Sequence, residues 1–252
     1  MARKARVESS TGIYHMIIRG FEMKDIFLED ENKNKILEII ESYKESCGYQ
    51  IYGYVVLDDH LHLLVKEGEV SIGNMMKRIG VKYVTWYHAT YDKNGRVFHD
   101  RFKSEPVENN EYLLSVLRYI HQEPVRLGLV TEVSRYKWSS FRDYIEKSAA
   151  VDTKTCLNLF GEDERWQQVS WQKFMNEPNE EKCLEAVREK VQDNDLKLML
   201  LRLGNIKNIE DLRKLPKKKR NEIIKDVKSM DGVSTWQIAK ITGLSQSVIT
   251  RI

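Results

Sequence analysis

The stretch GYVVLDDHLHLLV, residues 53–65, decides the fold of the first part of the chain. Residues 50–57 are rich in β-branched and aromatic side chains, which are typical of a strand. Asp58 and Asp59 supply a turn, and residues 60–66 form a second strand. The stretch therefore predicts two consecutive strands joined by a tight turn.

The second of these strands carries two histidines. Side chains alternate between the faces of a strand, so His60 and His62 share one face and the apolar positions 61, 63 and 65 share the other. We expect the apolar face to be the core side. Their Cβ atoms then lie about 6.5–7 Å apart, so that one nitrogen of each imidazole can bind the same metal ion. The alternative is that both histidines are ordinary polar groups on an exposed face, and the strand alone leaves this open.

The segments around this strand pair alternate between strand and helix patterns. We predict a strand at residues 14–19, helices at 31–46 and 71–91, a short strand region at 96–107, and a helix at 109–123 that Pro124 ends. The order predicts an α+β sandwich with helices on one face of a mostly antiparallel sheet. Strand patterns disappear after residue 146, so we expect one domain at 1–145 and an all-helical C-terminal region at 146–252. Helices are predicted at 184–203 and 209–215, and after the basic run 217–220.

The composition narrows the class of protein only slightly. The chain has 252 residues, with 41 Lys and Arg against 38 Asp and Glu, and a net charge of +3 predicts no partner by itself. The three cysteines are far apart and form no CxxC pair, which argues against a zinc site or a disulfide framework and favours a cytoplasmic location. Because no run of about 18 apolar residues occurs, we expect no membrane span.

The helix predicted before Pro124 brings a hydroxyl and a carboxylate together. Tyr119 and Glu123 lie one turn apart on the flank of its apolar stripe. A tyrosine with a free pKa of about 10 is a poor nucleophile and needs a metal or a base. Tyr112 competes on the same flank, and a half-buried tyrosine beside a surface glutamate is the plain alternative.

Five segments, taken together, carry a resemblance. They are YHMIIRG at 14–20, residues 53–65, GRVFHDRFKS at 95–104, RYIHQEPVRLG at 118–128 and WSSFRDY at 138–144. In order and spacing they resemble the HUH single-tyrosine transposases, especially the branch of REP-associated tyrosine transposases, over about residues 8–145. This resemblance implies a ferredoxin-like α+β sandwich.

The resemblance also implies roles for named residues. His60 and His62 would bind the metal, Mg²⁺ or Mn²⁺, and Tyr119 would be the nucleophile. Glu123 would be a further ligand, at a position where the usual pattern has Asn or Gln. The implied reaction is cleavage and strand transfer of single-stranded or hairpin DNA through a 5′-phosphotyrosine. The alternative is a non-cutting DNA-binding protein or transcriptional regulator on the same fold; a relaxase is disfavoured. Relatives exist as homodimers and as monomers.

Two regions are predicted to contact DNA. Basic residues near the predicted site would neutralise phosphates, and aromatic residues 86, 87, 98 and 102 could stack on bases or simply pack in the core. Residues 234–252 show the pattern of a helix-turn-helix with its turn at Gly243, which would bind duplex DNA. An ordinary helical hairpin is the alternative. The predicted DNA-contacting residues are Arg19, Arg96, Arg101, Lys103, Arg126, Gln246, Ser247, Thr250 and Arg251.

Overall fold

The computed structural model describes residues 6–21, 25–99, 101–146, 150–179, 182–185, 191–229, 233 and 235–252. The chain divides into two compact units, Met1–Ala186 and Val187–Ile252. Within the described residues, no helix combines the length and the apolar character needed to cross a membrane.

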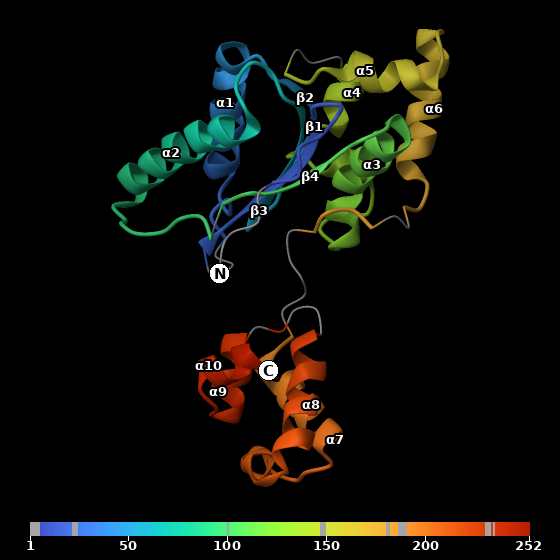
Figure 1. Cartoon of the computed structure of the whole chain (residues 1–252). Coiled ribbons are helices and arrows are strands. Elements are labelled where there is room, and N and C mark those ends of the chain that lie inside the picture. The colour runs from blue at the N-terminus through green and yellow to red at the C-terminus, as the bar shows by residue number, and fades with distance from the viewer. Residues whose placement is uncertain are drawn as a thin grey trace. The chain divides into compact units, whose positions relative to one another are not determined.

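A four-stranded antiparallel sheet forms the centre of the first unit (Figure 1). Its strands are β1 (Ile13–Arg19), β2 (Gln50–Val56), β3 (His60–Lys66) and β4 (Lys103–Pro106), in the order β2-β3-β1-β4. With α1 (Asp30–Cys47) and α2 (Ile72–Tyr91), the chain follows the βαββαβ order of a ferredoxin-like sandwich. The predicted α+β fold is therefore confirmed.

Helices α1 and α2 cover one face of this sheet (Figure 1). Ile36, Ile39 and Ile40 recur at helical spacing on α1 and are buried, so the helix turns one apolar stripe inward. Gly48 ends α1 in the left-handed conformation with φ 69°, which glycine adopts without steric cost. These helices and the sheet share one hydrophobic core.

Helix α3 (Asn110–Arg126) covers the opposite face, whereas we expected all the helices on one face (Figure 1). A Cβ atom added to Gly53 of β2 would lie 2.5 Å from Leu117 Cδ1, so α3 approaches the sheet where no side chain intervenes. The prediction that Pro124 ends this helix was wrong. Pro124 lies inside α3 and is buried, as are Ile120 and Glu123 beside it. This packing offsets the backbone hydrogen bond that proline cannot donate.

The strand predicted at 96–107 is broken into two parts. Phe98 forms only an isolated bridge to Gly20, and β4 begins at Lys103. Backbone hydrogen bonds from Phe21 N–H to Val97 O (2.7 Å) and from His99 N–H to Arg19 O (3.0 Å) tie residues 97–99 to the end of β1. The chain therefore pairs irregularly before it enters the regular edge strand.

The first unit extends beyond the boundary expected near residue 146. After a 3-10 turn at Val133–Arg135 come α4 (Phe141–Glu146), α5 (Thr153–Leu157), a 3-10 turn at Asn158–Phe160 and α6 (Glu164–Asn176). Trp171 of α6 is buried and stacks on Tyr144, with ring centroids 4.6 Å apart. Gln122 of α3 donates to the Met175 carbonyl at 2.9 Å. The loss of strand patterns therefore marks helices added against α3, and the unit boundary falls after residue 186.

The second unit is helical throughout its described residues. It contains α7 (Asp193–Gly204), a 3-10 helix (Ile209–Lys214), α8 (Lys217–Ser229), α9 (Thr235–Thr242) and α10 (Gln246–Arg251). The helix predicted at 184–203 is observed as α7, which the structure describes from Asp193. Residues 182–185 belong to the first unit and have no regular secondary structure, and the Leu184 N–H donates to Glu105 Oε1 at 2.8 Å. Leu196, Ile224, Ile238 and Ile249 belong to a separate apolar core.

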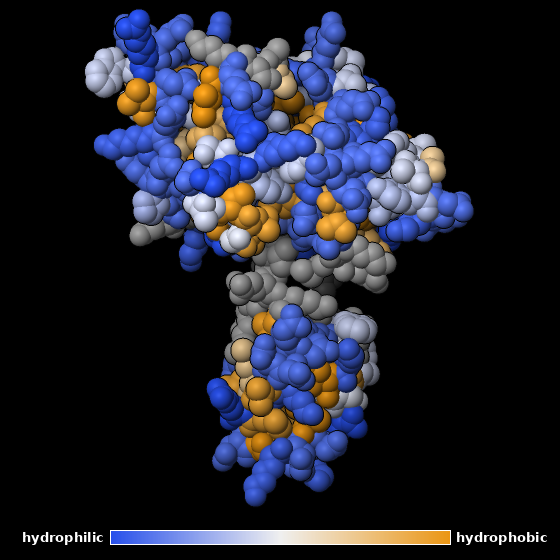
Figure 2. All heavy atoms as spheres, turned by 180° about the vertical axis from the view of Figure 1, so that it is seen from behind, coloured by the Kyte–Doolittle hydropathy of each residue, from blue (hydrophilic) through white to orange (hydrophobic). Residues whose placement is uncertain are grey.

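Helices α9 and α10 meet at Gly243, which has φ +64°. A Cβ atom there would collide with the Arg213 guanidinium, whose Nε donates to the Thr242 carbonyl at 2.9 Å. Glycine is therefore favoured by the left-handed backbone conformation, and any larger residue would also displace the end of the Arg213 side chain. On α10, Val248 is 38% exposed, whereas its neighbour Ile249 is fully buried. Apolar side chains also reach the surface of this unit among hydrophilic ones (Figure 2).

Candidate active site

The two histidines of β3 lie on the face that α3 covers. The register of the sheet places Ile17 of β1 opposite His62 and Arg19 opposite His60. Both histidines are buried, so the alternative of polar groups on an exposed face is wrong. The strand pattern could not show this, because α3 covers the face from a distant part of the sequence.

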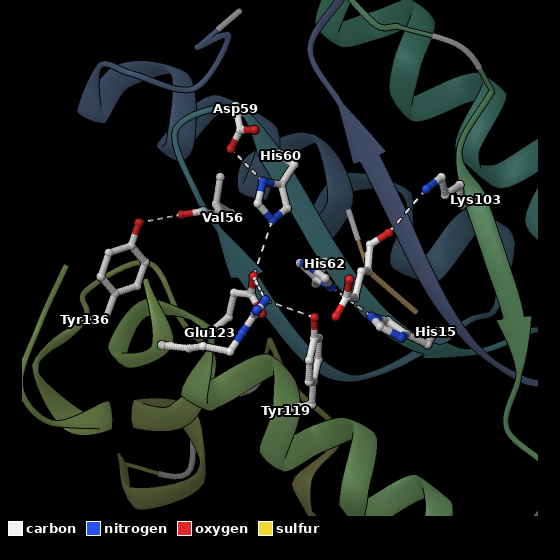
Figure 3. A network of polar contacts seen from close by, with 11 residues as sticks. His15, Val56, Asp59, His60, His62, Lys103, Tyr119, Glu123 and Tyr136 are labelled. Atoms are coloured by element: carbon white, nitrogen blue, oxygen red, sulfur yellow. Dashed lines mark hydrogen bonds and ion pairs between the residues drawn. The ribbon is translucent and has the colours of Figure 1, made fainter. Parts of the chain in front are cut away.

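Helix α3 places Tyr119 and Glu123 beside the histidine pair (Figure 3). One ligand atom from each of His60, His62 and Glu123 can be chosen so that all three lie within 4.8 Å of one another. The rings of Tyr119 and His62 have centroids 5.9 Å apart. The structure therefore brings together the predicted nucleophile and all three predicted metal ligands.

The free atoms of these ligands fit a divalent cation. His60 Nδ1 is hydrogen-bonded to Asp59 Oδ1 at 2.6 Å, and His62 Nδ1 to His15 Nε2 at 2.9 Å. Among the described residues, nothing forms a hydrogen bond with His60 Nε2, His62 Nε2 or Glu123 Oε2, and all three atoms are buried. Buried polar atoms without partners are costly and need an explanation. Two imidazole nitrogens and a carboxylate oxygen form a set that binds Mn²⁺ and similar cations.

The surroundings of His62 favour its neutral form. Burial holds the pKa of His62 well below its ordinary value, and the neighbouring His60, His15 and Arg126 lower it further. A neutral imidazole has the lone pair that a metal ligand requires. His62 is therefore ready to bind a cation without first losing a proton.

Arg126 links the Tyr119 hydroxyl to the Glu123 carboxylate by hydrogen bonds. Its Nη2 donates to the Tyr119 hydroxyl at 3.1 Å and to Glu123 Oε1 at 2.6 Å. Burial, followed by the Glu123 carboxylate, raises the pKa of Tyr119, while Arg126 opposes this shift. The hydroxyl is thus protonated at neutral pH. Arg126, predicted to contact DNA, thus lies beside Tyr119 and Glu123, the predicted nucleophile and the third predicted metal ligand.

The competing tyrosine lies elsewhere. Tyr112 is next to Glu105 of β4 and Cys183, and its pKa is raised by burial first and then by the Glu105 carboxylate. It is not part of the cluster around Glu123. The geometry therefore favours Tyr119.

The other basic residues predicted to contact DNA are dispersed over the first unit. Arg19 and Lys103 belong to the histidine face of the sheet, and Lys103 Nζ donates to the Glu185 carbonyl at 3.3 Å. Arg96 and Arg101 are exposed. The guanidinium of Arg118, the residue before Tyr119, lies over the Phe174 ring at 4.0 Å, so this side chain joins α3 to α6.

Most of the aromatic residues considered for base stacking pack in the core. Trp86, Tyr87 and Phe98 surround buried Tyr83, at centroid distances of 5.5, 6.0 and 5.7 Å. Phe102 lies under the Arg6 guanidinium at 3.8 Å.

The predicted DNA-contacting residues of the second unit all lie on α10. Ser247 and Arg251 are exposed. The side chains of Gln246 and Thr250 lie outside the part of the chain that the structure describes.

Sequence analysis missed three residues that support the histidines. They are His15, Asp59 and Glu105, which contacts His15 Nδ1 at 2.8 Å. Asp59 could have been found, because it directly precedes His60. The other two become visible only when the pairing of β1 with β3 and β4 is known.

The model of the family described as "Transposase IS200 like" matches residues 8–123, which contain the sheet, the two histidines, Tyr119 and Glu123. This segment belongs to the IS200-like transposase family. The match thus assigns residues 8–123, which include the sheet and α3 up to Glu123, to a family of transposases.

Solved structures agree with this IS200-like fold. The structure of a REP-associated tyrosine transposase bound to a REP hairpin is 20% identical and covers 58% of this chain and 87% of its own, with a TM-score of 0.51. This similarity shows a shared fold. The crystal structure described as a putative transposase from Deinococcus radiodurans R1 is 16% identical and covers 48% of this chain and 98% of its own, with a TM-score of 0.35. The search of curated proteins found no match.

Proposed function

We propose that the first unit is a metal-dependent transposase that cuts and rejoins single-stranded DNA through a covalent bond to Tyr119. One observation carries this proposal: His60, His62 and Glu123 converge, and each has a buried ligand atom without a hydrogen-bond partner among the described residues. Tyr119, on the same helix as Glu123, lies beside them. A protein that only binds DNA has no need for buried polar atoms left without partners. This convergence lies within the segment that belongs to the IS200-like transposases.

The proposed reaction is a transesterification. The Tyr119 hydroxyl oxygen attacks a backbone phosphorus and releases its proton to water; the new tyrosyl O–P bond forms as the bond from phosphorus to the 3′ oxygen breaks. The 3′ oxygen takes up a proton, so the products are a 5′-phosphotyrosine and a free 3′-hydroxyl. Because a phosphodiester is kept, attack by a second 3′-hydroxyl releases Tyr119 and joins the strands.

In this proposal the residues around Tyr119 have different functions, namely metal binding and positioning of the hydroxyl. His60, His62 and Glu123 would hold Mg²⁺ or Mn²⁺, which supplies Lewis-acid polarisation of the phosphate when bound. Arg126 holds the Tyr119 hydroxyl at 3.1 Å and fixes its position next to the cluster. Its exposed guanidinium also provides positive charge where a phosphate would enter.

We infer two DNA partners. Single-stranded or hairpin DNA would reach the first unit along Arg19 and Lys103 of the histidine face, as suggested by the REP hairpin bound to the related transposase. The second unit would contact duplex DNA through exposed Ser247 and Arg251 of α10, with an affinity that falls as salt increases. A homodimer stays a prediction.

A covalent adduct tests the reaction. Single-stranded oligonucleotides from the DNA flanking the gene, labelled at the 3′ end, should give a labelled adduct that survives denaturation only when Mn²⁺ is present. A 5′ label should instead appear on a shortened free strand. Tyr119→Phe should abolish the adduct and leave DNA binding intact, because only the reacting oxygen is removed.

Tyr112→Phe is the matched control, since it removes a hydroxyl from the same helix outside the cluster, and the adduct should persist. An adduct in Tyr119→Phe would disprove the nucleophile. Tight DNA binding by the unaltered chain without any adduct would favour the non-cutting DNA-binding protein.

A further inference from the structure

A chain of hydrogen bonds runs from Glu105 through His15 to His62 and crosses three adjacent strands. Figure 3 shows how His15 and His62, at one end of this chain, lie beside each other. Glu105 of β4 lies opposite His15 of β1, and His15 lies two residues from Ile17, the partner of His62 on β3. Glu105 Oε1 contacts His15 Nδ1 at 2.8 Å, and His15 Nε2 contacts His62 Nδ1 at 2.9 Å. Both histidines are fully buried, so these contacts replace water at each ring.

The direction of these hydrogen bonds follows from the end at Glu105. The backbone N–H of Leu184 donates to the same Oε1 atom at 2.8 Å. A backbone N–H can only donate, and an ionised carboxylate can only accept, so Oε1 accepts two hydrogen bonds. His15 therefore carries its proton on Nδ1 and donates it to Glu105.

The tautomer of His62 follows from that of His15. With its proton on Nδ1, a neutral His15 presents a lone pair on Nε2, and His62 must donate to it from Nδ1. A neutral His62 then has its free lone pair on Nε2, the buried atom without a hydrogen-bond partner among the described residues. The opposite direction would place a proton on His62 Nε2 and block it as a ligand.

We propose that His15 and Glu105 are positioning residues that fix His62 in the tautomer with a free Nε2 and hold that nitrogen toward the metal site. The importance of this for cutting rests on the proposed function, whereas the tautomer itself does not. His60 obtains the same support directly from Asp59 at 2.6 Å. The two ligands are thus oriented by one carboxylate each, directly for His60 and through His15 for His62.

The first measurement is the tautomer of His62 in the metal-free full chain, by long-range ¹⁵N–¹H NMR of histidine-labelled protein. We expect a protonated Nδ1 and an unprotonated Nε2 for both His15 and His62. His15→Phe keeps a ring in place but accepts no hydrogen bond, so His62 should become a mixture of tautomers. Its Mn²⁺ affinity, measured by EPR of free Mn²⁺ without DNA, should fall about 10–100-fold.

Variants at Glu105 make the test independent of the buried His15. Glu105 is partly exposed, so Glu105→Leu removes the acceptor without opening the core. This variant should lower Mn²⁺ affinity, whereas Glu105→Gln, whose amide oxygen still accepts, should recover most of it. Glu108→Gln is the control: Glu108 is exposed and bonds Ser10, and both measurements should be unchanged.

Two results would overturn the inference: a proton on His62 Nε2 in the unaltered chain, or unchanged tautomer and Mn²⁺ affinity in His15→Phe and Glu105→Leu. Failure of the proposed function looks different. In that case the unaltered chain binds Mn²⁺ and shows the expected tautomers but forms no DNA adduct.

Discussion

On β3, Leu61 and Leu63 face the side covered by α1 and α2, whereas His60 and His62 face α3. All four side chains are buried. On the leucine face, apolar packing compensates for the loss of water. On the histidine face, two nitrogens are left without hydrogen-bond partners among the described residues.

The difference teaches how one strand can serve two purposes. Burying a leucine side chain contributes about 1.5–3 kcal/mol to folding, whereas a buried polar atom without a partner costs about 1–3 kcal/mol. Burial of Leu61 and Leu63 therefore stabilises the fold, whereas burial of the unpaired nitrogens of His60 and His62 lowers its stability. If this division is correct, neighbouring substitutions on β3 should have separate effects.

The largest effect is expected for His62→Ala, which removes one of three ligands. In the unaltered chain, Mn²⁺ at about 100 times its Kd should stabilise the fold by about 2.7 kcal/mol, and this gain should disappear in the variant. Thermal unfolding with and without Mn²⁺ measures it, and the metal-dependent DNA adduct should be lost in parallel. An undiminished Mn²⁺ shift in the variant would show that His62 is not a ligand.

Leu63→Ala should act on the other face. Deleting a buried leucine side chain should lower the free energy of unfolding by about 2–5 kcal/mol, because it loses burial and leaves a cavity. Urea denaturation without metal measures this. Mn²⁺ affinity, measured by EPR where the variant is still folded, should stay unchanged. A folded Leu63→Ala variant that no longer binds Mn²⁺ would break the division between the faces.

The smallest effect is expected for Glu123→Gln, which keeps an oxygen ligand and removes its charge. The Mn²⁺ concentration for half-maximal adduct formation should rise about tenfold, since affinity for hard cations depends on ligand charge. The maximal adduct at saturating Mn²⁺ should be largely retained. Complete loss at every Mn²⁺ concentration would mean that the charge, or its contact with Arg126, is indispensable.

Local periodicity predicted much of the fold and showed which side chains of the candidate site share one face of an element, whereas the roles of these residues were predicted from the resemblance to the HUH single-tyrosine transposases. Alternation along residues 60–66 placed His60 and His62 on one face, and the four-residue spacing of Tyr119 and Glu123 placed both on one side of a helix. Each of these relations depends only on the geometry of a single element.

What remained beyond prediction depends on contacts between distant segments. The burial of the histidines comes from α3, and the contact of Glu105 with His15 comes from the pairing of β4 with β1. The buried position of Pro124 outweighed its usual effect on a helix. Likewise, the residues after 146 join the first unit through Trp171 and Tyr144, a contact that helical periodicity alone does not reveal.

Gly53 leaves room for a side chain of the helix that carries Tyr119. A single added carbon there would lie 2.5 Å from Leu117 Cδ1, so an alanine would force the end of this buried side chain to move. Tyr119 and Glu123 lie on α3 together with Leu117, whereas His60 and His62 lie on β3. The absence of a side chain at one position of β2 thus lets α3 pack directly against the sheet that carries the two histidines.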